Sequence, residues 1–424
     1  MDHHQQDVEG DVLLLDHLPA AVTVGCDAVA FSTTKPFLGC KSIPPGVHLV
    51  WIAPSAMHSS RSGHWFVTQR PAFPGEPARI HVRVWDQSTE ALVNPPSEDS
   101  QATLAQRLPA ISAKLPPYHL QFSAAAKTQA VDLPVFMDRE SVWDNLTYAI
   151  DSGVLEAVTG KPAPDWGVST SDRVSGEIQP PAEAELYSEA SRRLRFTFPA
   201  DIKLFNPEST GSERTQQALD PTAWVLRTLG DPAGPRRLDH LVGELQFAFL
   251  TGMHLGNFSC LEQWWFIVNR IIFRSYELAV SSPALSQSLI RTFHAQIVYN
   301  EQFLEGDVFD MMPENTKLLQ KSLTTYRSRL MEKLQSLDDS NRTPDHLLLQ
   351  DTFSALEAWL AQHLGWDLSS DYVRSGTVML EDGELVEAEL SDFEDEDERG
   401  EFAATVVELD EQGRPTDMVS WNDT

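Results

Sequence analysis

The chain has 424 residues, of which 42% are hydrophobic, so it is too long for one ordinary core and apolar enough to bury more than one. Its formal charge of -30, from 32 basic and 62 acidic residues, argues against direct binding of RNA or DNA, because that binding relies on Lys and Arg displacing counterions from phosphates. The three cysteines, Cys26, Cys40 and Cys260, show no paired spacing, so they predict neither a disulfide framework nor a zinc site and suit a reducing compartment.

The N-terminus gives no indication of export. Residues 1–10 are polar and acidic, without the basic start and apolar stretch of a signal peptide. No apolar run approaches the length needed to cross a bilayer. We therefore expect a soluble protein that is not secreted and binds no membrane.

The first part of the chain has a pattern typical of β-strands. From residue 12 to residue 85 the apolar segments are short, rich in β-branched and aromatic residues, and separated by turn residues. The clearest expected strands are 47–52, 64–68 and 80–85. Just before the first of them, Pro45 presets a negative φ and Gly46 accepts a positive one, which predicts a type II turn.

A helix that begins near Ser141 is expected to close this first domain. The stretch 161–190 then holds many Pro, Ser, Gly and Glu residues and little apolar periodicity. Such a composition predicts an exposed linker, because it offers little surface to bury.

The second half of the chain has the periodicity of helices. Apolar side chains recur every three or four residues in stripes that begin at Phe258, Leu319 and Leu349. The last of these helices should have Thr343 as its N-cap, Pro344 as its first residue and Gly365 just past its end. Several such helices with short connections predict an all-α bundle or superhelix.

The C-terminal tail is strongly acidic. Residues 371–424 hold 18 Asp and Glu residues against three Arg, a net charge of -15 that argues against folding by burial alone. Two stretches are nevertheless β-prone: one around the hairpin-type turn Asp382-Gly383, the other from Phe402 to Leu409. Each is either a strand that adds to a partner's sheet edge or a stray apolar patch, and composition favours neither.

No motif for a catalytic or cofactor site is found. The Gly-x-Ser-x-Gly elbow is absent. The closest approach to a phosphate loop, from Gly153 to Gly160 and Lys161, has six residues between its glycines where four are required. The 13 histidines are scattered, and Trp264 and Trp265 are interpreted as core packing. We therefore expect a protein that is not an enzyme and has no cofactor and no metal.

Two stretches resemble the signatures of a known family. Residues 37–48, Phe-Leu-Gly-Cys-Lys-Ser-Ile-Pro-Pro-Gly-Val-His, preceded by Gly25-Cys26-Asp27, are similar to the N-terminal signature of the Aar-two splicing-factor family. Residues 241–249, Leu-Val-Gly-Glu-Leu-Gln-Phe-Ala-Phe, are similar to the signature of its helical domain. The residues that carry this resemblance are Gly39, Lys41, Pro44, Pro45, Gly46, Gly243, Glu244, Leu245, Gln246 and Phe247.

The resemblance implies a non-enzymatic assembly factor of the spliceosomal U-five small nuclear ribonucleoprotein. Such a factor binds the central scaffold Prp-eight, through its RNase H-like and Jab/MPN domains, in a cytoplasmic precursor particle. It thereby delays binding of the helicase Brr-two until the particle matures in the nucleus, so both compartments are expected. The implied fold is a sandwich-like β domain followed by a helical domain similar to the VHS superhelix.

The resemblance also favours the docking reading of the tail, because the family's tail joins partner domains through an added strand. The corresponding residues here are Phe402, Ala404, Thr405, Val406, Val407, Glu408 and Leu409. Family members are switched by phosphorylation. Ser391, which precedes an acidic run, is a possible site on that context alone.

The expected organisation is α+β and multidomain: a β-rich domain over 1–160, a flexible linker over 161–192, a helical domain over 193–367, and a disordered acidic tail over 368–424 with the docking strand. An alternative function is a general helical adaptor for short peptides or ubiquitin-like partners, which would need only the helical domain.

Overall fold

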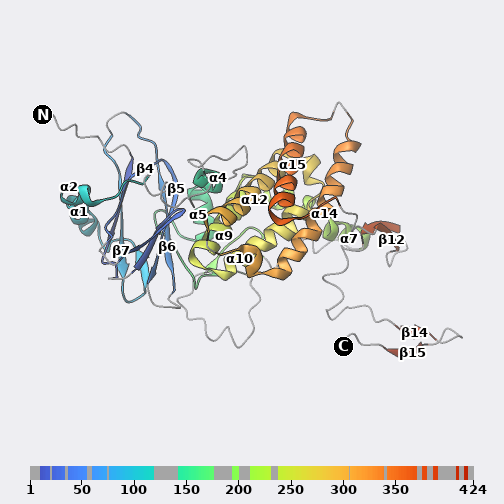
Figure 1. Ribbon diagram of the computed structural model, residues 1–424, viewed down its shortest axis with the longest axis horizontal. Helices are drawn as coiled ribbons and strands as arrows, with labels where there is room; N and C mark the ends of the chain where they lie inside the picture. The colour runs from blue at the N-terminus through green and yellow to red at the C-terminus, as the bar shows by residue number, and fades with distance from the viewer. Residues whose placement is uncertain are drawn as a thin grey trace.

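A computed structural model gives the arrangement of the chain. It describes residues 10–19, 22–33, 37–54, 60–73, 76–118, 142–175, 193–199, 211–230, 237–304, 306–338, 341–369, 375–379, 385–389, 407–409 and 415–418. Figure 1 shows a β-rich part and a helical part side by side, with the C-terminal strands beyond the helices. The mixed α+β class is therefore confirmed.

Two sheets build the β-rich part. The four-stranded sheet has the order β4-β1-β7-β8 and consists of β1 (Asp11–Asp16), β4 (Gly39–Ile43), β7 (Ile80–Asp86) and β8 (Ala91–Val93). The five-stranded sheet is antiparallel throughout, has the order β3-β2-β5-β6-β9 and consists of β2 (Val22–Cys26), β3 (Val29–Thr33), β5 (Gly46–Pro54), β6 (Ser62–Thr68) and β9 (Trp166–Ser169). The expected strands 47–52, 64–68 and 80–85 are confirmed within β5, β6 and β7.

The two sheets form a sandwich around a shared core. Alternate residues of both contribute to it, including Leu13 of β1, Val24 of β2 and Trp85 of β7. The outer face of the four-stranded sheet packs on α1 (Glu98–Gln106) and α2 (Leu108–Ile111) through a separate apolar cluster. The outer face of the five-stranded sheet, with Leu49 and Trp65, joins the core of the helical part. The molecule is thus layered from α1 and α2 through two sheets to the helices (Figure 1).

The prediction of an exposed linker is wrong for residues 166–169. Strand β9 lies inside the stretch 161–192 and pairs with β6, with Trp65 opposite Trp166. Trp166 is buried, so this strand completes the sheet that faces the helices. Propensity missed it because a four-residue edge strand gains its stability from the sheet it joins and not from its own sequence. Residues 176–192 lie outside the described residues.

Two helices follow the β-rich part in the first half of the chain, and helices dominate the described second half as expected. In chain order they are α4 (Val142–Thr147), α5 (Ser152–Thr159), α7 (Gly211–Leu219), α8 (Thr222–Leu229), α9 (His240–Leu255), α10 (Phe258–Phe266), α11 (Leu278–Ser281), α12 (Pro283–Phe303), α13 (Val308–Met311), α14 (Pro313–Ser336) and α15 (Pro344–Leu364). The ends of α15 are confirmed, with a Thr343 capping box and Gly365 at φ +66°. No described helix is long and apolar enough to span a membrane.

The expected stripe that begins at Phe258 is only partly confirmed. Trp265, Val268 and Ile272 are buried, but Phe258 is 51% exposed at the first position of α10. After Phe266 the helix widens into a π-helical turn, Ile267–Ile271, so one helical period does not continue through the stretch. Trp264 and Trp265 are both buried, which confirms their interpretation as core packing.

The described part of the tail consists of two antiparallel strand pairs. Strands β12 (Ser375–Met379) and β13 (Leu385–Glu389) pair antiparallel on either side of the expected Asp382-Gly383 turn. Strands β14 (Val407–Leu409) and β15 (Pro415–Met418) pair in the same way.

Candidate functional site

The N-terminal signature forms the crossing from one sheet to the other. Gly39 in β4 has a φ of +125°, and a Cβ there would collide with the carbonyl oxygen of Leu13 in the neighbouring strand, so only glycine fits. Lys41 donates from Nζ to the Ser112 carbonyl at 3.1 Å, while its own carbonyl accepts from the Tyr118 amide at 2.8 Å. These contacts join the four-stranded sheet to the segment that follows α2.

At the corner between β4 and β5, backbone carbonyls are held by two side chains. Gly46 has a φ of +156°, which is nearly extended and far from the value of about +80° in a type II turn, so the expected turn type is not confirmed. Pro44 and Pro45 are exposed. The Pro44 carbonyl accepts from Thr68 Oγ1 at 2.6 Å and lies 2.9 Å from His48 Nε2. The corner is therefore fixed by side chains of β5 and β6.

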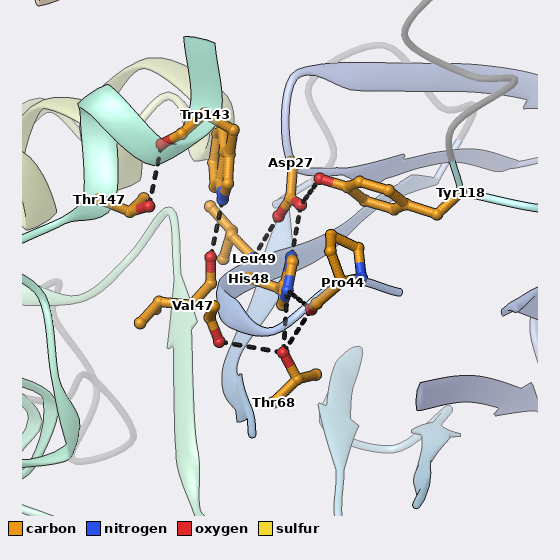
Figure 2. Close-up of polar contacts among 10 residues, drawn as sticks. Asp27, Pro44, Val47, His48, Leu49, Thr68, Tyr118, Trp143 and Thr147 are labelled. Atoms are coloured by element: carbon orange, nitrogen blue, oxygen red, sulfur yellow. Dashed lines mark hydrogen bonds and ion pairs between the residues drawn. The ribbon is translucent and has the colours of Figure 1, made fainter. Parts of the chain in front are cut away.

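Asp27 lies at the centre of this network, as Figure 2 shows. It is fully buried, its Oδ1 accepts from the Leu49 amide at 2.8 Å, and its Oδ2 lies 2.7 Å from His48 Nδ1 and accepts from the Tyr118 hydroxyl. Burial and the Asp27 charge raise the pKa of Tyr118 well above its ordinary value, so its hydroxyl keeps the proton that it donates. The carboxylate is thus supplied with three donors.

The charge on His48 is set by two opposing effects. Burial disfavours the imidazolium, but the negative charge of Asp27, its hydrogen bond and the Pro44 carbonyl outweigh burial, so the pKa of His48 is raised above 6.5. In the charged form both ring nitrogens donate, one to Asp27 and one to Pro44.

Thr68, His48 and Asp27 are arranged like the nucleophile, base and acid of a hydrolase triad. Their hydrogen bonds nevertheless argue against catalysis. A general base must accept the nucleophile's proton. The Thr68 hydroxyl instead donates to the Pro44 carbonyl, and the side chain is only 4% exposed. The arrangement is that of a buried structural network.

A second anchor reaches the same strand from the helical side. Trp143 of α4 donates from Nε1 to the Val47 carbonyl at 2.7 Å, as Figure 2 also shows. Tyr118 is thus bonded to Asp27, and Trp143 is bonded to Val47 at the start of β5. The two residues lie on either side of residues 119–141 in the sequence.

The helical signature lies on α9, where this helix meets the β-rich part. A Cβ on Gly243 would fall 2.6 Å from the Ala149 carbonyl oxygen and 2.8 Å from Val154, so glycine allows α9 to approach α4 and α5 closely. Gln246 accepts from the Ala149 amide at 3.0 Å and donates to the Asn145 carbonyl at 3.3 Å.

The other signature residues of α9 also face inward. Phe247 stacks on Trp65 of β6 with ring centroids 5.5 Å apart. Glu244 is buried and accepts from both the amide and the hydroxyl of Thr197, each at 2.8 Å. The Leu245 carbonyl accepts from Gln296 of α12 at 3.1 Å. The signature therefore binds the two halves together and does not present a surface.

The sequence reasoning missed the part of this junction near the end of α9. His254 packs between Trp51 of β5 and Trp143 of α4, with centroids 6.0 Å from each. Its carbonyl accepts from Arg61 Nη1 at 2.8 Å. Burial, and then the Arg61 charge, lower the pKa of His254 to about 4, so the ring is neutral at pH 7. The residues beside His254 in the sequence do not show that it belongs to this junction. Its contacts with Trp51 and Trp143 in the fold do.

The expected docking residues of the tail are only partly described. Val407, Glu408 and Leu409 form β14, with Val407 opposite Met418 and Glu408 opposite Asp417 in β15. The other expected residues, Phe402, Ala404, Thr405 and Val406, lie outside the described residues, as does Ser391. Sequence reasoning did not identify β15, the strand that pairs with this segment.

Within the described ranges no three His, Cys, Asp or Glu side chains are grouped to hold a metal ion. The helical signature is buried in the fold, whereas Pro44 and Pro45 of the N-terminal signature are exposed, and the docking role of the tail stays a prediction.

Comparison with known proteins agrees with the resemblance in both halves. A family model described as the AAR2 N-terminal domain matches residues 9–160, and one described as the AAR2 C-terminal repeat region matches residues 196–369. The Protein AAR2 homolog of Macaca fascicularis is 24% identical over 302 residues, covering 68% of this chain and 76% of that protein. The Protein AAR2 homolog of Homo sapiens is 23% identical over 305 residues with the same coverage. Because the two models together span well over half of the sequence, in the expected order, the chain belongs to the AAR2 family.

Proposed function

We propose that this protein is a non-enzymatic assembly factor of the spliceosomal U-five small nuclear ribonucleoprotein. Family membership supports a splicing-related role in general. In the proposed mechanism the protein binds the scaffold Prp-eight, through its RNase H-like and Jab/MPN domains, in a precursor particle. It thereby delays the helicase Brr-two, and it acts in both cytoplasm and nucleus.

One observation carries this proposal: both family models match, each on its own half of the chain. Phe247 of α9 and Trp65 of β6 stack in a core that the sheet and the helices share. This shared core supports a model in which both parts of the protein bind the partner as one rigid unit. A charge of -30 further favours a protein partner over bare nucleic acid.

The tail supplies the proposed docking element. Strand β14 has one edge paired with β15, and its other backbone edge offers the N–H and C=O groups that a partner's sheet edge can take up. An isolated two-stranded hairpin is only marginally stable in water, so pairing with a partner would extend it into a stable sheet.

Deletion of residues 402–424 tests the docking element. We expect the affinity for the RNase H-like and Jab/MPN domains of Prp-eight to fall at least tenfold, or about 1.4 kcal/mol, as measured by calorimetry. The matched control keeps the tail and replaces the acidic residues of 392–398 by Asn and Gln. Unchanged affinity after deletion, or an equal loss in the control, would refute strand docking.

A competition experiment tests the function itself. With the full-length protein present, Brr-two should bind the Prp-eight domains at least tenfold less tightly than without it. If Brr-two binds equally well in both cases, the proposed delay is wrong even where the tail still binds.

A further inference from the structure

Two arginines are exposed on the described segment that precedes α7. Arg193 begins β11 (Arg193–Leu194), and Arg195 follows two residues later. Leu194 and Phe196 are buried, whereas Arg193 and Arg195 are exposed. This alternation is that of an extended chain, so both arginines lie on its outward side, with Cα atoms about 7 Å apart over two strand steps.

The backbone of this segment is held on both sides. The Arg195 amide donates to the Val158 carbonyl of α5 at 2.8 Å, and the Leu194 carbonyl accepts from the Ser175 amide at 2.7 Å. A Cβ on Gly160 would lie 3.9 Å from Cζ of Arg195, so the guanidinium lies beside the turn that ends α5. The two arginines are thus presented from a backbone that the fold keeps in place.

These two guanidinium groups carry no counter-charge from the described part of the chain. Neither Arg193 nor Arg195 forms a side-chain hydrogen bond or an ion pair with another described residue. Strand β10 (Arg173–Val174) pairs in parallel with β11 and places Arg173 directly opposite Arg193. Asp172, the carboxylate just before β10, is buried and accepts from the Ser169 amide at 2.9 Å. The segment is therefore a basic spot on a chain with a formal charge of -30.

We propose that Arg193 and Arg195 bind a phosphorylated serine or threonine of a partner protein. Each guanidinium can donate two parallel hydrogen bonds to one anionic group. A phosphate on a side chain has three acceptor oxygens and a charge of about -1.5 to -2, which suffices for both arginines. A carboxylate has two oxygens, and one guanidinium already occupies both. The pair therefore matches a phosphate group better than an Asp or Glu side chain.

Other sources of phosphate fit this surface less well. An RNA strand carries one phosphate per nucleotide and is bound by a row of Lys and Arg, whereas a pair of arginines matches a single phosphate. The formal charge of -30 further opposes a long polyanion. A free phosphate ion would contact the two arginines alone, whereas a protein segment also contacts the surface around them.

Fluorescence polarisation with the full-length protein tests this proposal without any splicing component. The probe is a labelled library of short random peptides with a central phosphoserine, compared with the same library carrying serine or glutamate there. We expect the phosphoserine library to bind at least tenfold more tightly than either of the others. Equal binding of the three libraries would overturn the proposal.

Variants locate the binding on the two arginines. Arg193→Gln combined with Arg195→Gln should abolish the preference for phosphoserine. The matched control, Arg70→Gln combined with Arg227→Gln, removes the same charge from two other exposed arginines and should bind as the natural protein does. Both variants should melt like the natural protein, because all four side chains are exposed. Equal losses in the two variants would show an effect of net charge alone and refute the site.

A conservative variant and two competitors complete the test. Arg193→Lys combined with Arg195→Lys keeps the charge and the fold, but it should still weaken phosphoserine binding, because an ammonium group cannot make the paired hydrogen bonds. Unchanged binding in this variant would contradict recognition by the guanidinium groups. Inorganic phosphate and a short single-stranded RNA should not displace the library at the concentration of unlabelled phosphopeptide that does. Displacement by either one at that concentration would overturn the assignment to a phosphorylated protein.

Discussion

Asp27 shows how much of the sandwich depends on one buried carboxylate. Its oxygens take hydrogen bonds from the Leu49 amide, the His48 ring and the Tyr118 hydroxyl, and it has no exposed surface. A charge in such a place is tolerated only when it is fully hydrogen-bonded. Removal of one donor leaves the carboxylate short of a partner and should be costly.

The Tyr118→Phe substitution tests this directly. It deletes the hydroxyl that donates to Asp27 and should lower the free energy of unfolding by about 1.5–3 kcal/mol, as for a hydrogen bond to a charged group. Urea denaturation measures the loss. In the control Tyr148→Phe the side chain is 51% exposed, so its bond to Thr292 should matter less. Equal losses in both variants would contradict the special role of Asp27.

Two buried histidines should give stability profiles of opposite slope with pH. The raised pKa of His48, set by Asp27 against burial, gives stability that is complete below pH 6.5 and is lost as pH rises through the raised value. Burial lowers the pKa of His254 to about 4, so its contribution is complete above pH 6.5 and is lost as pH falls toward 4.

The variants His48→Gln and His254→Gln check these signs by urea denaturation from pH 4.5 to pH 8.5. The stability advantage of the natural protein over His48→Gln should shrink as pH rises. Its advantage over His254→Gln should shrink as pH falls. Parallel profiles for the two variants would show that the assigned charge states are wrong.

At the scale of elements, the packing of α9 on α4 and α5 depends on Gly243. In Gly243→Ala the new methyl group would fall 2.6 Å from the Ala149 carbonyl oxygen, so the helix must shift, at a cost of about 1–3 kcal/mol. Thermal denaturation measures the cost. The control is Gly153→Ala in α5, whose methyl group would lie 3.2 Å from Asp151 Oδ1, the N-cap atom that accepts from the Val154 amide. It should cost less than Gly243→Ala, because a side chain and not the backbone has to move. A stable Gly243→Ala variant would contradict the close contact.

The elements that sequence could predict are those with local causes. The cap at Thr343 and the glycine at 365 define α15, and β-branched alternation defines β7, because each pattern acts within its own element. Strand β9 could not be predicted from its own four residues, because its stability depends on pairing with the distant strand β6.

In the candidate site too, features with local causes could be predicted and those that depend on distant contacts could not. Resemblance identified Gly243 and Phe247, but their contacts with Ala149 and Trp65 join residues far apart in the chain, so only the fold reveals that they hold two halves together. His254 had no local signal at all, and its role follows from the aromatic rings around it. The limits of the domains, the VHS likeness and the disorder of the acidic tail stay predictions.

At the scale of the whole molecule, a continuous core argues for cooperative unfolding. The apolar cluster that includes Trp65 of the sheet also includes Phe247 and the interior of the helices. Calorimetry should therefore show one transition for the described halves together. Two well-separated transitions would contradict the shared core.

The Phe247→Ala variant extends this test. Loss of the ring that stacks on Trp65 should cost about 3–5 kcal/mol and lower the midpoint of both halves together. The control is Phe73→Ala, whose side chain is 60% exposed and should change stability by less than about 0.5 kcal/mol. If Phe247→Ala splits the transition in two, the halves are coupled mainly through this one contact.

The two anchors at the start of β5 have a consequence for how the layers of the molecule stay aligned. Tyr118 belongs to the core between the two sheets and bonds to Asp27, whereas Trp143 belongs to the core shared with the helices and bonds to the Val47 carbonyl. The start of β5 is therefore clamped from both faces of its sheet, so the sandwich and the helices cannot slide past each other without breaking a buried hydrogen bond.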